Sequence, residues 1–147
     1  MSKAIIIYDS RTGSTETMAR AIEEGMTESG IQVLSKRATK AGAGDLEDVD
    51  AVVLGCPTYN GDLMPSMRTF LFEMEKANLK GKVGVAFGSY GWSGEAVQRM
   101  ADTMKHVFEM NVTEPGLKLL RRPGERDLSE CKAFGRKIGE RIREGVR

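Results

Sequence analysis

The sequence predicts an α/β fold in which a mostly parallel sheet carries helices on both faces. Short apolar runs of strand length alternate along the whole chain with stretches whose apolar residues recur at helical spacing. The chain has 147 residues, of which 40% are apolar, and this size and composition suit one domain with its own core. We therefore expect a single domain over residues 1–147.

The first strand is expected at residues 4–8, a continuous apolar run typical of a strand that is covered on both faces. The helix that follows has apolar residues at helical spacing, namely Met18, Ala19, Ile22 and Met26. Gly30 stands where a helix commonly ends, and a weaker second strand begins at residues 31–34.

The same alternation continues through the rest of the chain. Further strands are expected at residues 51–56 and 83–87, and a fifth within residues 113–120, broken by Pro115 and Gly116. Pro65 suits the first turn of a second helix. A third helix is expected over residues 97–108 and a closing helix over residues 128–146. Residues 57–64 and 88–94 are expected to form loops.

The loops after the first, third and fourth strands are the expected ligand-binding loops, because ligands of open α/β sheets bind at the carboxyl ends of the strands. The first loop leads directly into a helix, and amides at a helix N-terminus attract anions. Hydroxyl side chains add further donors there: Ser10, Thr12, Ser14 and Thr15. Because the loop has no lysine, it suits one terminal phosphate better than a metal-bound triphosphate.

Other phosphate motifs are missing. The chain lacks the G-x-x-x-x-G-K-S/T loop, a G-x-G-x-x-G fingerprint after the first strand, and a cysteine followed by arginine six positions later. A signalling receiver would need an aspartate at the end of the third strand, where Gly55 and Cys56 stand. The simpler interpretation of the first loop is a helix cap, but a cap needs one hydroxyl residue and not four.

The second and third loops place aromatic residues among glycines. Tyr59 lies in the second loop, and Tyr90 and Trp92, the only tryptophan, lie in the third. A flat ring ligand would explain loop aromatics through stacking, and the glycines would let the backbone approach that ring. For Tyr90, packing on its own loop is an equally good interpretation. The three loops together predict a site for a planar mononucleotide.

Residues 6–22 resemble the phosphate-loop signature of flavodoxins almost position for position, and the strand pattern agrees along the chain. Residues 57–61 and 88–94 are also similar to loops in the flavodoxin-like domain of flavo-diiron proteins. No long insertion splits the fifth strand, as in short-chain flavodoxins. The resemblance implies a three-layer flavodoxin-like sandwich with five parallel strands in the order 2-1-3-4-5, and non-covalently bound FMN.

The resemblance also implies roles for individual residues. The phosphate would be held by the first loop with help from Thr58, and the backbone around Gly61 would meet flavin N5. Tyr59 or Asn60 would line the inner face of the ring, and Trp92 would stack on the outer face. The implied cofactor-binding residues are Ser10, Arg11, Thr12, Gly13, Ser14, Thr15, Pro57, Thr58, Tyr59, Asn60, Gly61, Asp62, Ser89, Tyr90, Gly91, Trp92 and Gly94.

The function implied is that of a low-potential electron carrier working between redox partner proteins, without catalysis of its own. The alternatives are an FMN-dependent NAD(P)H:quinone reductase and a non-redox binding module on the same fold. With 22 basic and 21 acidic residues, the chain has no charge excess that calls for nucleic acid or a membrane. Flavodoxins are typically acidic, so their usual docking to basic partners does not transfer to this chain.

Basic residues are concentrated near the end of the chain. Residues 118–147 hold ten basic and five acidic residues, a net charge of +5. We favour a solvated, charged helix face, and the alternative is a docking patch for an acidic partner.

Cys56 and Cys131 match no metal-ligand spacing, which favours free thiols in the cytoplasm and no metal site. His106 is expected to be structural or partly exposed. A monomer or weak dimer is expected.

Overall fold

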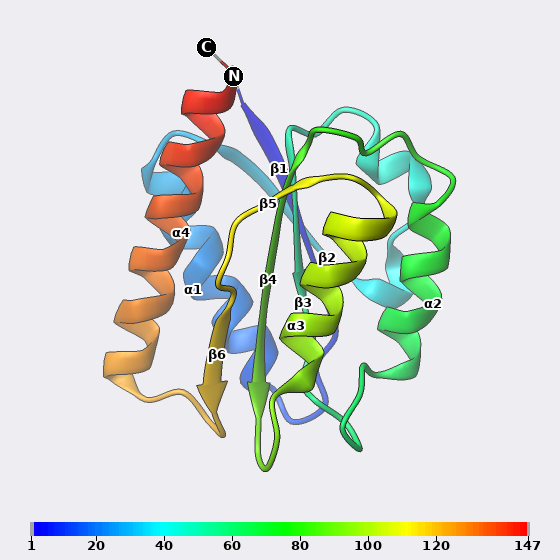
Figure 1. Ribbon diagram of the computed structural model, residues 1–147. Helices are drawn as coiled ribbons and strands as arrows, with labels where there is room; N and C mark the ends of the chain where they lie inside the picture. The colour runs from blue at the N-terminus through cyan, green and yellow to red at the C-terminus, as the bar shows by residue number, and fades with distance from the viewer. Residues whose placement is uncertain (1, 147) are drawn as a thin grey trace.

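The computed structural model describes residues 2–146 and contains one parallel sheet (Figure 1). Its strands are β1 Lys3–Tyr8, β2 Gln32–Arg37, β3 Ala51–Gly55, β4 Val83–Tyr90, β5 Asn111–Val112 and β6 Leu117–Leu120. The order across the sheet is β2-β1-β3-β4-β5, and β6 also pairs with β4. The predicted strand order 2-1-3-4-5 is therefore confirmed.

The fifth position in the sheet is shared by two short strands. β5 pairs with β4 at Val83 and Gly84, and β6 pairs with the end of β4, from Phe87 to Tyr90. The expected break at Pro115 and Gly116 lies between them, although β5 begins two residues before the predicted strand. Pro115 has no amide hydrogen to donate to a neighbouring strand, so the pairing stops there.

Helices cover both faces of the sheet, as predicted (Figure 1). They are α1 Ser14–Glu28, α2 Pro65–Met74, α3 Glu95–Asp102 and α4 Glu125–Val146. Short 3₁₀ helices at Ala38–Lys40 and Ala43–Leu46 lead from β2 towards β3, and a π-helical turn, Thr103–Val107, follows α3. Within residues 2–146, no helix combines the length and the apolar character needed to cross a membrane.

Each face of the sheet has its own apolar core. Ile5 and Ile7 of β1 pack with buried residues of α2 and α3, whereas Ala4 and Ile6 pack with those of α1 and α4. Successive residues of a strand point to opposite faces, so a strand buried on both sides must be apolar throughout. This is why the continuous runs in the sequence predicted the strands correctly.

Helices α1 and α4 approach so closely that their backbones touch. A Cβ atom added at Gly25 would lie 2.0 Å from the carbonyl oxygen of Lys132, and one added at Gly135 would lie 2.2 Å from that of Ile22. Only glycine fits at such distances. The long contact with α4 fixes the position of α1, and therefore of the α1 N-terminus.

Several predicted boundaries were wrong. Gly88, Ser89 and Tyr90 belong to β4 and not to the loop, because β6 pairs with them. The third helix keeps α-helical geometry only to Asp102, before the π-helical turn. The closing helix begins at Glu125 and not at residue 128, and the Asp127 carboxylate accepts a hydrogen bond from the Gly124 amide there.

The two cysteines are free, as the sequence predicted, and both are buried. Burial raises the pKa of each thiol to about 12, so both are neutral packing groups. His106 is exposed on the π-helical turn.

Candidate cofactor site

The loops after β1, β3 and β4 gather at one end of the sheet, the lower end in Figure 1, where the arrowheads of β4 and β6 point. A pocket of about 460 Å³ opens there. It is lined by Arg11, Thr12, Ser14, Pro57, Thr58, Ser89, Tyr90, Gly91, Trp92, Arg121 and Arg122. Residues from all three predicted loops therefore meet at one hollow.

The first loop turns into α1 at Gly13, which has φ +94°, a backbone conformation that favours glycine. The Ser10 hydroxyl oxygen accepts hydrogen bonds from the amides of Gly13 (3.1 Å) and Glu16 (3.3 Å). The Thr17 hydroxyl donates to the Gly13 carbonyl at 2.8 Å. Gly13 is therefore the N-cap of α1 and no side chain caps it, whereas Ser10, three residues earlier, supports the turn through these two hydrogen bonds.

Other groups of the first loop remain available to a ligand. Within residues 2–146, the amides of Thr12, Ser14 and Thr15 have no protein hydrogen-bond acceptor. The hydroxyls of Thr12 and Ser14 lie 3.5 Å apart at the pocket. Unpaired amides at the N-terminus of a 15-residue helix attract an anion. This donor set fits a phosphate group.

Hydrogen bonds connect the three loops. The hydroxyls of Thr15 and Ser89 are 2.9 Å apart and buried, which links the first loop to β4. The Thr58 amide donates to the Ser89 carbonyl at 3.1 Å. The Thr58 hydroxyl oxygen accepts a hydrogen bond from the Ala96 amide at the start of α3, also at 3.1 Å. The walls of the pocket are therefore held in place before any ligand enters.

The second loop contains a tight turn from Tyr59 to Asp62. The two residues exchange backbone hydrogen bonds of 2.8 and 3.0 Å, with φ +50° at Asn60 and +73° at Gly61. The Arg11 guanidinium carbon lies 4.6 Å from the centre of the Tyr59 ring. Arg11 thus covers the tyrosine face on the pocket side of the turn, and none of the four turn residues lines the pocket itself.

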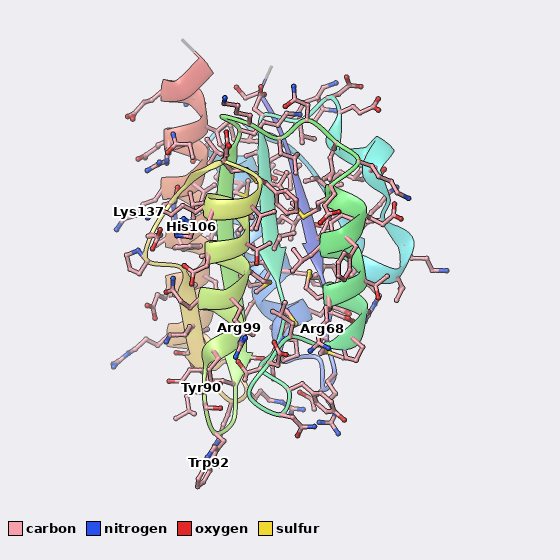
Figure 2. The ribbon with its side chains drawn as sticks, turned by 45° about the vertical axis from the view of Figure 1, so that its right-hand side comes forward. Arg68, Tyr90, Trp92, Arg99, His106 and Lys137 are labelled. Atoms are coloured by element: carbon pink, nitrogen blue, oxygen red, sulfur yellow. The ribbon has the colours of Figure 1, made fainter. Side chains whose placement is uncertain are left out.

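Asp62 binds two arginines outside the pocket. Its carboxylate lies 2.6 Å from Arg68 and 3.5 Å from Arg99. A hydrogen bond from the Leu63 amide lowers the pKa of Asp62 most, and Arg68 and Arg99 lower it further. Figure 2 shows both arginines beside the second loop. The carboxylate is therefore ionised and already paired, so it holds the turn against α2 and α3.

The third loop carries the most exposed aromatic side chain of the site. Trp92 is 95% exposed and points away from the body of the protein at the tip of the loop (Figure 2). Tyr90 is half-buried at the end of β4. Both residues line the pocket, and Gly94 lies beyond it, against Tyr90 and Lys118. An indole with so little packing of its own is available to a ring ligand or to a partner protein.

A buried carboxyl group lies directly before the first loop. Asp9 is 7% exposed, and one of its oxygens accepts a hydrogen bond from the Ser10 amide at 3.1 Å. The other oxygen is buried and has no hydrogen-bond partner among residues 2–146. Burial raises the pKa of Asp9, against the opposing effects of the Ser10 hydrogen bond and the nearby Arg37.

The structure adds two residues that sequence reasoning missed, Arg121 and Arg122. Arg121 has φ +59°, and its amide donates to the Tyr90 carbonyl at 2.7 Å, which turns the chain across the end of β4. Both residues directly follow β6, whose carboxyl end lies at the same end of the sheet as the pocket. The rule that ligands bind at strand ends would have found them, had the fifth strand been included.

Comparison with known proteins places this fold and site in context. The family model for flavodoxin matches residues 6–135. A solved flavodoxin from the domain Archaea is 36% identical, with a TM-score of 0.92, and the match covers 96% of this chain and 99% of that chain. The flavodiiron protein from Giardia intestinalis has a TM-score of 0.92 and 26% identity over 99% of this chain and 37% of that chain.

Among curated proteins, a type A flavoprotein (fprA) from Rhodobacter capsulatus is 36% identical over 94% of this chain and 33% of its own length. The chain spans about a third of the length of the first curated relatives that it matches. What is shared with these relatives is therefore the flavodoxin-like portion.

Proposed function

The chain belongs to the flavodoxin family, whose cofactor is FMN, and on that premise we propose that it is a low-potential electron carrier between redox proteins. Family membership supports FMN-dependent electron transfer, and the role as a carrier is the proposal. We also propose that residues 1–147 act as one FMN-binding domain. The observation that carries this function is the group of unpaired amides at the start of α1, facing a pocket lined by aromatic residues.

The phosphate of FMN is assigned to the first loop. The amides of Thr12, Ser14 and Thr15 have no protein acceptor, and the hydroxyls of Thr12 and Ser14 are at the pocket. The dipole of α1 favours a negative charge at this position. Ser10 and Gly13 would shape the turn, and Thr58 would hold the second loop beside it. No lysine or metal is required for such a cradle.

The ring of FMN is assigned to the aromatic side of the pocket. Tyr90 and Trp92 line it together with Gly91, Ser89 and Pro57. Indole and phenol rings stack on flat ligands, and the exposed Trp92 gains most from being covered. The turn from Tyr59 to Asp62, covered by Arg11, would close the opposite side through its backbone.

FMN, when bound, supplies the electron chemistry, and the protein supplies position and electrostatics. The linked hydroxyls of Thr15 and Ser89 fix the distance between the phosphate loop and β4. The Asp62 pairs with Arg68 and Arg99 keep the second loop from moving away. A site that is built before the ligand arrives costs little ordering entropy on binding, which suits a permanently held cofactor.

A pocket of about 460 Å³ lies within the usual range of sites for one small ligand. The decisive first experiment compares FMN with riboflavin, which lacks the phosphate. We expect FMN to bind about 100-fold more tightly, because several charge-assisted hydrogen bonds are lost without the phosphate. Quenching of flavin fluorescence measures both affinities.

Equal affinities for FMN and riboflavin would contradict the assignment of the phosphate to the first loop. Failure to bind either flavin would favour a non-redox module on the same fold. The second measurement adds NADH or NADPH to the FMN-loaded protein under air. Steady oxidation of either nucleotide would contradict the carrier and favour an FMN-dependent reductase. A carrier alone should show no turnover above that of free FMN.

A further inference from the structure

The pocket has an unusual charge pattern. Its lining includes Arg11, Arg121 and Arg122 but no carboxylate. All three arginines are exposed, and none of them forms an ion pair with any described residue. Arg11 lies over the face of the Tyr59 ring, and this contact does not neutralise its positive charge. We refer to Arg11, Arg121, Arg122 and Trp92 as the arginine rim.

The basic residues of α4 are in a different situation. Lys132 forms ion pairs with Glu24 and Glu28 at 3.2 Å, and Arg136 pairs with Glu28 at 3.8 Å. Further along, Arg141 donates to the Asn111 side chain and Arg143 to the Ser29 carbonyl. These side chains therefore join α4 to the rest of the protein. Of the net charge of +5 in residues 118–147, +3 comes from Lys118, Arg121 and Arg122, which precede α4.

Nearby carboxylates do not neutralise the rim. Asp62 is engaged by Arg68 and Arg99. Glu95 has a lowered pKa because Ser93 donates a hydrogen bond to it, with further contributions from its own backbone amide and from Arg99 and Lys118. Each of these two carboxylates therefore has its own basic neighbours, and neither forms an ion pair with Arg11, Arg121 or Arg122.

Apolar surface accompanies this charge. Trp92 is 95% exposed and Leu120, which pairs with Tyr90 in the sheet, is 55% exposed. Tryptophan and arginine are the residues most enriched among those that dominate protein–protein binding energy, and a central aromatic anchor beside charged residues is typical of such sites. The rim thus combines an apolar anchor with positive charges that favour a partner whose surface is negatively charged.

We propose that the arginine rim is the docking surface for an acidic redox protein, one that presents carboxylates around a small apolar spot. This inference rests on the proposed function, since docking there places the partner at the mouth of the cofactor pocket. The three arginines would attract the partner from a distance and orient it. Leu120 and the face of Trp92 that the flavin ring does not cover would pack against its apolar spot. The sign of the charge is opposite to that expected for an acidic flavodoxin.

The test uses FMN-loaded protein that is reduced under argon with a stoichiometric amount of sodium dithionite and then mixed with ferricyanide, a trianion that accepts one electron per ion. Poly-L-glutamate serves as a carboxylate-rich surface that competes for the rim, and poly-L-lysine is its control. We expect poly-L-glutamate to slow the reaction about fivefold at low ionic strength, with the effect lost in salt, whereas poly-L-lysine does not slow it.

Two double variants locate the effect. In Arg121→Glu/Arg122→Glu, ferricyanide should react about tenfold more slowly at low salt, and poly-L-glutamate should no longer compete. Lys3→Glu/Lys137→Glu makes the same change in net charge away from the pocket and should behave as the unmodified protein. Lys3 begins β1, at the opposite end of the sheet, and Lys137 lies far from Trp92 in Figure 2. Trp92→Ala should weaken competition by poly-L-glutamate less than the charge reversal does.

Three results would overturn the proposal. They are no effect of poly-L-glutamate on the unmodified protein, equal effects of the two double variants, and loss of bound FMN from Arg121→Glu/Arg122→Glu, which would assign the arginines to the cofactor. A protein that never takes up FMN fails earlier, in the flavin-binding measurement. That failure rejects the proposed function and is therefore distinguishable from failure of the docking surface.

Discussion

Helix α1 has two regions with opposite properties. Along its body, Ile22 and Met26 are fully buried, and Gly25 touches the backbone of α4. In its first turn, the amides of Ser14 and Thr15 have no protein acceptor. The body is fixed by packing, and this allows the first turn to keep hydrogen-bond donors unused for a ligand. Stability and binding are thus assigned to different residues of one helix.

The largest expected effect comes from a substitution in the body of α1, where it packs against α4. Gly25→Ala would improve helix propensity by about 1 kcal/mol. The added methyl group would, however, lie 2.0 Å from the Lys132 carbonyl oxygen, so α1 and α4 must separate. We expect the steric cost to win and the free energy of unfolding to fall by about 2–3 kcal/mol. Urea denaturation followed by circular dichroism measures this change.

A matched control is Gly44→Ala, because a Cβ atom at Gly44 has no neighbour within 4 Å and φ there is not positive. This variant should change the free energy of unfolding by no more than about 0.5 kcal/mol. If Gly25→Ala were as harmless as Gly44→Ala, the close contact between α1 and α4 would not be a source of stability.

A smaller effect is expected at the first turn. Gly13→Ala introduces no clash, but an L residue with a side chain is strained at φ +94°. The free energy of unfolding should fall by about 1–2 kcal/mol. FMN affinity should fall more than riboflavin affinity, because two of the amides that we propose bind the phosphate, those of Ser14 and Thr15, follow this residue. Gly13→Asn tolerates the left-handed region better and should recover part of both losses. Equal losses for the two flavins would separate this turn from the phosphate site.

The smallest expected effect concerns Asp9, the buried residue directly before the first loop. Burial raises the pKa of Asp9 above its ordinary value of 3.8, so the folded protein holds this proton more tightly than the unfolded chain. Asp9 therefore lowers stability as pH rises from 3.8 through its folded pKa, and the loss stays constant above that point. Asp9→Asn cannot titrate, so its stability relative to the unmodified protein should rise as pH increases through this window. Urea titrations at several pH values test this, and a difference independent of pH would contradict it.

Much of the fold could be predicted because a strand that is buried on both faces appears in the sequence as a continuous apolar run. The run at β1, the proline that begins α2 and Gly30, with φ +86° after α1, all behaved as local rules require. These signals depend on near neighbours in the chain. The phosphate loop could be recognised for the same reason, since its donors lie within one short segment.

Features that depend on distant pairing could not be predicted locally. Gly88 to Tyr90 look like a flexible loop in sequence and become strand only because β6 lies beside them. Arg121 and Arg122 reach the pocket for the same reason, although more than 100 residues separate Arg121 from Arg11. The need for glycine at position 25 is likewise set by α4, which lies at the other end of the chain.

The division of the last sheet position between β5 and β6 has a consequence for association between molecules. A long, regular outer strand is a template to which a strand of another copy can add, and growth of that kind leads to aggregates. Here the outer strands contain two and four residues, and Pro115 interrupts the line of amides between them. Lys118 adds a charge to the longer piece, and charged edges also discourage strand addition. The interruption therefore disfavours strand addition at this edge of the sheet, and the carboxyl end of β6 still lies beside the pocket.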